Sequence, residues 1–206
     1  MAQSRQKQID QAWHQVRREL YAVGLLAEGV YLDEIHLSVA PLPSLGEAGY
    51  VFDSGLSLWP RLLGYEEGVI YLPSGSKYHA YVPGGTLVDT IRHEYAHAWA
   101  WLDRRFINRP WFARAFDRRY DDEWSFGAKA YALFHDHPEE FRASGYYGDF
   151  VSAYAMSAPC EDFAETFMMY LRYRRSLERF RGRPGVVRKL RAVVAAVEQM
   201  RRHLAL

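Results

Sequence analysis

The sequence has little that would tie it to an oxidising compartment or to a membrane. Its 206 residues include one cysteine, Cys160, which excludes an intramolecular disulfide. No apolar run approaches the ~18 residues that a membrane-spanning helix needs, and the first residues, MAQSRQKQIDQAWHQ, lack the apolar core of a secretory signal. Internal repeats and low-complexity segments are also absent. We therefore expect a cytoplasmic protein without a membrane span.

Charge is distributed unevenly along the chain. The formal net charge is +1, but residues 170–206 hold 11 Arg or Lys against two acids, so this segment carries +9 and residues 1–169 carry −8. The basic segment could dock on the acidic remainder of the chain, or it could bind nucleic acid or phosphate. Few aromatic side chains are interleaved with its arginines, which disfavours nucleic acid as a partner.

The order of the elements predicts the fold class. Hydrophobic residues make up 49% of the chain and charged residues 25%, as in an ordinary globular domain. Residue periodicity places strands early and helices later, which indicates an α+β fold. The predicted strands are 35–43, 50–59 and 68–73, and the predicted helices are 6–28, one from Thr86, 111–119, 127–135, a short one from Pro138, 159–179 and 184–204.

Two of these helices have a clear apolar stripe. Thr86 is the predicted N-cap of the first, with Asp89 three residues later. Its stripe consists of Leu87, Ile91, Tyr95, Ala98 and Leu102. His93 and His97 fall on the opposite side of this helix, so we expect them to face a cleft. The predicted inward face of the last helix consists of Val187, Leu190, Val194, Val197 and Leu204.

The stretch HEYAH, residues 93–97, indicates a metal site. Two histidines four residues apart on a helix can place both imidazole nitrogens about 2.0–2.1 Å from one zinc ion. Glu94 would lie beside the ion without binding it, where it can take a proton from metal-bound water. The stretch therefore predicts two ligands, His93 and His97, and one general base, Glu94.

A third ligand is expected downstream, in CEDFAETF. Glu161 at the start of a helix could bind the ion, which leaves Glu165, one turn later, to accept a hydrogen bond from a ligating histidine. Acidic residues in the first turn of a helix also simply favour its dipole, so this pair has a purely structural interpretation as well.

HEYAH followed by EDFAE resembles the gluzincin branch of the zincin metallopeptidases. In that branch the third ligand is a glutamate on a later helix, and a carboxylate four residues further on supports a histidine. The stretch SAYAMSAPCEDFAETF looks especially like the lethal-factor-like peptidases and small bacterial zinc-binding peptidases. The lethal-factor type has a tyrosine seven residues before the ligating glutamate, and Tyr154 stands seven residues before Glu161.

This resemblance, which covers about residues 68–175, implies a complete site. His93, His97 and Glu161 would bind one Zn²⁺ per chain, Glu94 would be the base, and Tyr154 would donate its hydroxyl to the oxyanion. The implied substrate is a peptide or protein. Pro159 and Cys160 precede Glu161, which moves the expected serine cap of this helix to Ser157.

The resemblance also implies a zincin-like fold. A small mixed sheet would lie over the active-site helix in an upper lobe, residues 1–105, and residues 106–206 would form a mainly helical lower lobe of the same domain. The strand GVIYLP, residues 68–73, would be an edge strand that pairs with extended substrate. Without the family, an ordinary sheet strand is the preferred interpretation of this stretch.

Zinc-dependent peptide-bond hydrolysis is the function that this pattern favours. Two alternatives stay open: a metal-stabilised binding module that uses the basic C-terminal helix, and a zinc hydrolase of non-protein amides. Glu94 argues against the first, because a structural zinc site needs no base. Cys160 is either a redox-active thiol at a helix start or a small buried hydrophobe, and the second is the commoner case. A further metal site in FHDHPEEF, residues 134–141, is disfavoured because neighbouring loop side chains point apart.

Overall fold

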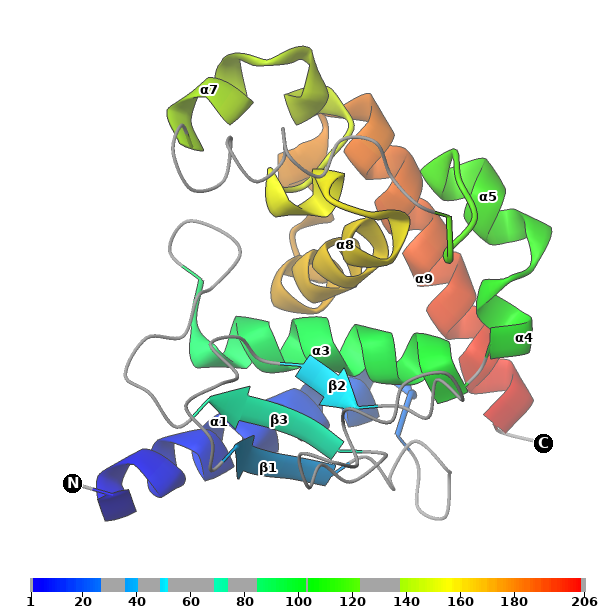
Figure 1. The fold of residues 1–206 in the computed structure, drawn as a ribbon. Helices are drawn as coiled ribbons and strands as arrows, with labels where there is room; N and C mark the ends of the chain where they lie inside the picture. Colours follow the sequence, from blue (N-terminus) through cyan, green and yellow to red (C-terminus); the bar gives the residue numbers. More distant parts are fainter. Residues whose placement is uncertain are drawn as a thin grey trace.

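The computed structural model describes residues 2–26, 36–40, 49–51, 69–73, 85–102, 104–122 and 138–204. Helix α3 crosses the middle of this structure, with a small sheet and helix α1 on one side and helix α8 on the other (Figure 1). Helices α5 and α9 pack beside α8. The α-helices are α1 (Ala2–Val23), α3 (Leu87–Leu102), α4 (Arg104–Ile107), α5 (Pro110–Phe116), α7 (Pro138–Ala143), α8 (Pro159–Tyr173) and α9 (Pro184–Leu204). Short 3-10 helices are η2 (Gly145–Gly148), η3 (Tyr154–Met156) and η4 (Leu177–Phe180).

The predicted α+β class is wrong, because the described part of the chain is mainly helical. Its strands are β1 (His36–Ala40), β2 (Gly49–Val51) and β3 (Val69–Pro73). They pair in the order β1-β3-β2, with β1 parallel and β2 antiparallel to β3. Strands of three to five residues cover little of α3, so packing between helices supplies most of the core.

The predicted edge strand lies inside this sheet. β1 pairs with β3 from Val69 to Pro73, and β2 pairs with the other side of β3 from Val69 to Tyr71. The backbone groups that an extended peptide would need are therefore already used by neighbouring strands. The assignment of residues 68–73 to a substrate-pairing edge is wrong.

Helix α1 lies against α3 through an apolar face and a buried group of charges. Ile9, Val16 and Leu20 are buried at helical spacing, and the helix stops where Gly24 takes a φ of +77°. Arg92 of α3 donates two hydrogen bonds to Glu19 of α1, at 2.6 and 2.8 Å. This bidentate pair fixes the rotation of α1 relative to α3.

Arg92 also belongs to a chain of charges that reaches α8. Its Nη1 lies 2.5 Å from Oδ1 of Asp89. The other oxygen of Asp89 accepts a hydrogen bond from Arg172 of α8 at 2.9 Å. The Arg92–Asp89 and Arg172–Asp89 ion pairs and the bonds from Arg92 to Glu19 therefore link α1, α3 and α8.

Aromatic side chains form the core between α3, α5 and α8. The ring of Trp99 lies 5.4 Å from that of Phe167 and 5.8 Å from that of Phe163. Phe112 of α5 lies 5.9 Å from Phe163 and 4.5 Å from Phe116. Such contacts fix the position of α8 over α3, because large rings interdigitate in only a few arrangements.

The predicted helices differ in how well their limits agree with the structure. The helix predicted over 159–179 ends at Tyr173, and a turn then leads to η4. α9 spans 184–204 as predicted, but Val187 and Val194 are only half buried while Lys189 is buried. The helix predicted over 127–135 lies outside the described residues, as do His135, Asp136 and His137. None of the described helices combines the length and apolarity that crossing a bilayer requires.

Candidate metal centre

Helix α3 brings two histidines together on one side. Asp89 Oδ2 accepts a hydrogen bond from the Thr86 amide at 3.0 Å, and the Asp89 amide donates to Thr86 Oγ1 at 3.4 Å, so the predicted cap is confirmed. The Nε2 atoms of His93 and His97 lie 3.2 Å apart, one turn from each other. His93 is only 2% exposed, so it faces the packed interior and not an open cleft, while His97 is partly exposed.

Helix α8 presents Glu161 to both histidines. Its carboxylate Oε2 lies 3.0 Å from His93 Nε2 and 3.4 Å from His97 Nε2. The helix begins with Pro159 at its first position after Ala158, which supplies no side-chain cap. The predicted cap at Ser157 is wrong, because its hydroxyl donates to the Tyr154 carbonyl oxygen at 2.8 Å.

The three donor atoms form a triangle of the size that zinc requires. Its sides are 3.0, 3.2 and 3.4 Å. A tetrahedral shell with ligands about 2.0–2.1 Å from the ion has edges of about 3.3–3.4 Å. Among the described residues, this is the one group of three His, Cys, Asp or Glu side chains with ligand atoms so close together. The donor set of two imidazoles and one carboxylate therefore fits a zinc ion.

Glu165 lies beside the far nitrogen of His93. Its Oε1 is 2.7 Å from His93 Nδ1, and the carboxylate is fully buried. Ser152 donates a hydrogen bond to the second oxygen of Glu165 at 2.6 Å and accepts one from the Ala155 amide at 3.1 Å. With the Nδ1 proton directed at Glu165, the Nε2 lone pair of His93 is free to bind a metal. Ser152 was not identified from the sequence.

His97 has a different support, which the sequence did not indicate. The hydroxyl oxygen of Tyr120 lies 3.1 Å from His97 Nδ1. Burial raises the pKa of Tyr120 well above its usual value, and the neighbouring Cys160 and Glu161 add to this shift. The phenol is therefore neutral, and its oxygen can accept a hydrogen bond from the Nδ1–H group of His97. Tyr120 follows α5, whose last turn ends at Asp117 in a left-handed conformation with φ 61°.

The charges in this group are strongly coupled. Burial alone would lower the pKa of His93, but its hydrogen bonds to Glu161 and Glu165 outweigh burial and raise the pKa well above 6.5. Burial would raise the pKa of Glu161, but the two histidines hold it well below the usual range. Without a cation, the site therefore favours a protonated His93 beside an ionised Glu161.

Glu94 and Tyr154 lie beside His93. Glu94 is buried on α3, and burial raises the pKa of its carboxyl although His93 and His97 oppose the shift. Tyr154 is in η3, with its ring centroid 5.9 Å from that of His93. A carboxylate with a raised pKa is a better proton acceptor, which favours Glu94 as a base. The ring of Tyr154 lies beside that of His93.

Helix α9 contacts the segment that carries Glu161, although it holds none of the candidate ligands. Lys189 is 2% exposed, and its Nζ lies 2.6 Å from Oδ2 of Asp162, the residue after Glu161. The same ammonium donates to the Asp149 carbonyl oxygen at 2.7 Å and lies 4.0 Å from the Phe150 ring. Burial raises the pKa of Asp162 to about 7, and Lys189 opposes this shift.

Two more α9-side contacts hold the segment before Ser152. Arg183 donates to the Tyr147 carbonyl oxygen at 2.7 Å and to the Phe150 carbonyl oxygen. Gly185 packs so closely on Asp149 that an added Cβ would lie 2.7 Å from its Cα. The chain that leads to Ser152 and Tyr154 is therefore fixed against α9.

Cys160 is a poor nucleophile in this setting. Its sulfur lies 3.9 Å from Glu161 Oε1. Burial raises the pKa of the thiol to about 12, and the charge of Glu161 adds to the shift. The side chain is therefore a neutral thiol near pH 7, although it is only partly buried.

Comparison with known proteins places the chain in a family. No curated protein and no solved structure matches it. A model of the family described as "putative zinc-binding metallo-peptidase" matches residues 79–200. The matched range includes His93, His97 and Glu161, the helices that carry them and most of α9. By this match, and with a donor triangle that zinc would fill, the chain belongs to that family of zinc-binding metallopeptidases.

Proposed function

We propose that this protein is a zinc-dependent peptidase that hydrolyses peptide bonds with Glu94 as general base. The observation that carries the proposal is the triangle of His93, His97 and Glu161, with Glu94 beside His93 on the same helix. One zinc ion per chain is proposed, bound by these three side chains. Three protein ligands leave one position of a tetrahedral ion open, which is the arrangement of catalytic and not of structural zinc.

Zinc, when bound, lowers the pKa of water towards ~7 and polarises a carbonyl group. Glu94 then takes the proton from water and later delivers it to the leaving amine. Its burial and raised pKa support this role, because a base whose pKa is nearer to neutral both accepts and returns a proton readily. Tyr154 donates its hydroxyl to the oxyanion as the carbonyl carbon becomes tetrahedral, a role that its position beside His93 supports.

Glu165 and Tyr120 orient the two imidazoles. Each accepts a hydrogen bond from the Nδ1–H group of one histidine, Glu165 from His93 and Tyr120 from His97, so that both Nε2 atoms face the same point. The proposed substrate is a peptide or a protein.

Zinc analysis combined with a cleavage assay tests the proposal. We expect Glu94→Gln to keep one zinc per chain and to slow cleavage of an unbiased peptide library by roughly 10²–10⁴-fold, which is the usual contribution of a general base. Glu139→Gln is the matched control, because Glu139 is exposed on α7 and the same change there should leave cleavage unaltered. Cleavage by Glu94→Gln at the wild-type rate would exclude Glu94 as the base. A zinc-loaded wild type that cleaves nothing would exclude the peptidase function.

A further inference from the structure

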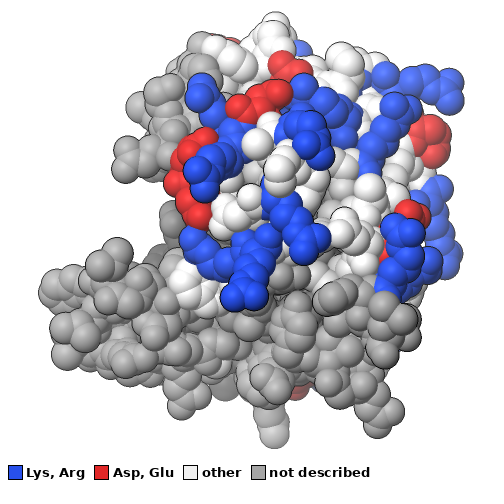
Figure 2. Space-filling model, turned by 90° about the vertical axis from the view of Figure 1, so that its right-hand side faces the viewer, with Lys and Arg blue, Asp and Glu red and all other residues white. Residues whose placement is uncertain are grey.

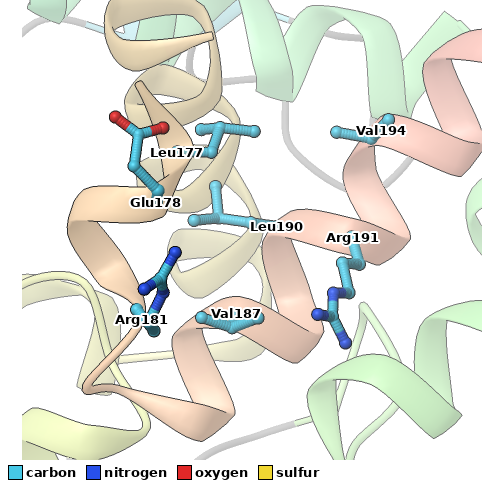
Figure 3. Close-up of a pocket in the computed structure, with 7 residues that line it drawn as sticks. All are labelled: Leu177, Glu178, Arg181, Val187, Leu190, Arg191 and Val194. Carbon is cyan, nitrogen blue, oxygen red and sulfur yellow. The ribbon is translucent and has the colours of Figure 1, made fainter. Parts of the chain in front are cut away.

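A half-open groove lies between η4 and α9. It has a volume of about 360 Å³ and is lined by Leu177, Glu178, Arg181, Val187, Leu190, Arg191 and Val194 (Figure 3). This volume is at the small end of the range for ligand sites, and the groove is too open to enclose a small molecule. It fits one or two side chains of a larger partner.

The floor of the groove is an apolar stripe of α9 that the rest of the molecule leaves partly uncovered. Val187, Leu190 and Val194 recur at spacings of three and four, so they lie on one face of the helix. Leu190 is buried, whereas Val187, Val194 and Leu177 of η4 remain half buried. In an amphipathic helix the apolar residues at this spacing are normally buried completely.

Two arginines at the rim have no partner among the described residues. Arg181 and Arg191 are exposed, and no acidic side chain in the described ranges forms an ion pair with either. Other basic residues nearby are engaged: Arg188 pairs with Asp117, and Lys189 with Asp162. Glu178 is the one acid that lines the groove.

The wider surface around α9 has the same sign of charge. Figure 2 turns the side of the molecule with α4, α5 and α9 towards the viewer, and Lys and Arg side chains predominate over Asp and Glu on it. A positive surface attracts acidic partners before contact and repels basic ones.

We propose that the groove between η4 and α9 binds an acidic amphipathic peptide segment of a partner protein. Its leucine-like side chains enter the apolar floor, and its carboxylates pair with Arg181 and Arg191. Arginine suits this role because its planar guanidinium binds a carboxylate through two hydrogen bonds. Apolar anchors at helical spacing flanked by charged groups are the usual features of a helix that binds in a groove.

The groove is separate from the metal centre. None of the residues that line it is a candidate ligand, although Lys189, between Val187 and Leu190, pairs with Asp162 next to Glu161. The groove and the metal centre share no side chain, so the inference does not depend on the proposed peptidase activity.

Fluorescence anisotropy with a short fluorescein-labelled helical peptide of glutamate and leucine, its leucines at spacings of three and four, tests this inference. We expect the full-length protein to bind it with a dissociation constant on the order of 10–100 µM, because so small an interface is weak. Binding should weaken as salt is added, since the arginines are exposed. The double variant Arg181→Glu, Arg191→Glu should weaken it at least ~10-fold, and Val187→Gln should weaken it through the apolar floor.

Three controls make the result decisive. Arg202→Glu changes an exposed arginine at the far end of α9 and should leave binding unchanged. A peptide with lysine in place of glutamate should not bind the wild type, but it should bind the double Glu variant. All arms are repeated with Glu94→Gln, so that cleavage of the peptide is not mistaken for weak binding.

Either of two results would overturn the proposal. One is equal binding of the acidic and the lysine peptides by the wild type. The other is no binding of the acidic peptide together with arginine-dependent binding of phosphatidylserine vesicles, which would assign the groove to a lipid surface.

Discussion

The α3 side and the α8 side of the metal centre are stabilised by different contacts. On the α3 side, Arg92 bonds to Glu19 and Asp89, and Asp89 also bonds to Arg172. Charged side chains from three helices therefore stabilise the start of α3 together. On the α8 side, the residue after Glu161 is held by one buried ion pair, Asp162 with Lys189. Loss of one charge should therefore be tolerated better beside α3 than beside α8, because Asp89 keeps a charged partner whereas Asp162 keeps only the Thr166 hydroxyl.

The strongest test of this comparison removes the ligand on the α8 side. Glu161→Ala should reduce zinc affinity well beyond the roughly 10–100-fold that loss of a supporting residue costs, because two imidazoles alone hold zinc weakly. Competition with a chromophoric zinc chelator measures the affinity. Glu139→Ala, on exposed α7, is the control. Zinc binding by Glu161→Ala at the wild-type level would remove Glu161 from the donor set.

Loss of the single ion pair should have the next largest effect. Lys189→Met leaves the buried Asp162 with no charged partner and only the Thr166 hydroxyl, 3.5 Å away, and we expect it to lower the free energy of unfolding by about 3–5 kcal/mol, measured by urea denaturation. The folded variant should also bind zinc more weakly, since Glu161 adjoins Asp162. Replacing both residues, Lys189→Met with Asp162→Leu, should recover most of the stability.

Arg172→Met is the matched change on the other side of the comparison. Its guanidinium is partly exposed, and Asp89 keeps Arg92 as a partner, so the loss of stability should be below that of Lys189→Met. Equal losses in the two variants would show that the sides do not differ.

The supports of the two histidines allow a finer comparison. Glu165→Gln replaces a buried carboxylate beside His93 and should lower zinc affinity by about 10–100-fold. Tyr120→Phe removes a neutral acceptor beside His97 and should cost less, since hydrogen bonds to charged groups are the stronger ones. Isothermal titration with zinc compares the two. A larger loss in Tyr120→Phe would reverse this order.

The smallest expected effect is a dependence of zinc stabilisation on pH. The raised pKa of His93 means that its proton stabilises the metal-free fold fully below about pH 6.5, and that this stability is lost as pH rises through the raised value. Zinc binds only the neutral imidazole, so the increase in melting temperature that zinc causes should grow above about pH 6.5. Differential scanning fluorimetry with zinc or chelator measures it. An increment that shrinks as pH rises would contradict the assignment.

Sequence reasoning found the parts of the site that repeat at helical spacing. His93 and His97 share one side of α3, and Glu161 and Glu165 one side of α8. The four-residue spacing indicated the histidines, and the gluzincin resemblance was needed to favour Glu161 as a ligand over a purely structural interpretation. Tyr120 lies 23 residues after His97 and reaches it by way of α4 and α5. Ser152 meets Glu165 from an irregular segment. Such contacts depend on tertiary packing, which periodicity does not report.

The fold class was predicted less well than the group of three candidate metal ligands. Stretches rich in β-branched residues did form strands, but the strands are too short to make a second layer, so the α+β class fails. On α9 the predicted inward face and the buried face differ because Lys189 is buried. Its ammonium pairs with Asp162, which turns the helix so that Val187 and Val194 lie partly at the surface. A lysine in an amphipathic pattern is read as solvent-facing, and here it faces inward.

Gly185, near the start of α9, limits which amino acids the sequence can tolerate at this position. Its neighbour is the Cα of Asp149, which cannot rotate aside as a flexible side chain would. Even one methyl group there would wedge α9 away from the chain that precedes Ser152, and the disturbance would reach the hydroxyl that bonds to Glu165. A position with no side chain, which holds none of the candidate ligands, therefore limits which residues this part of the sequence tolerates.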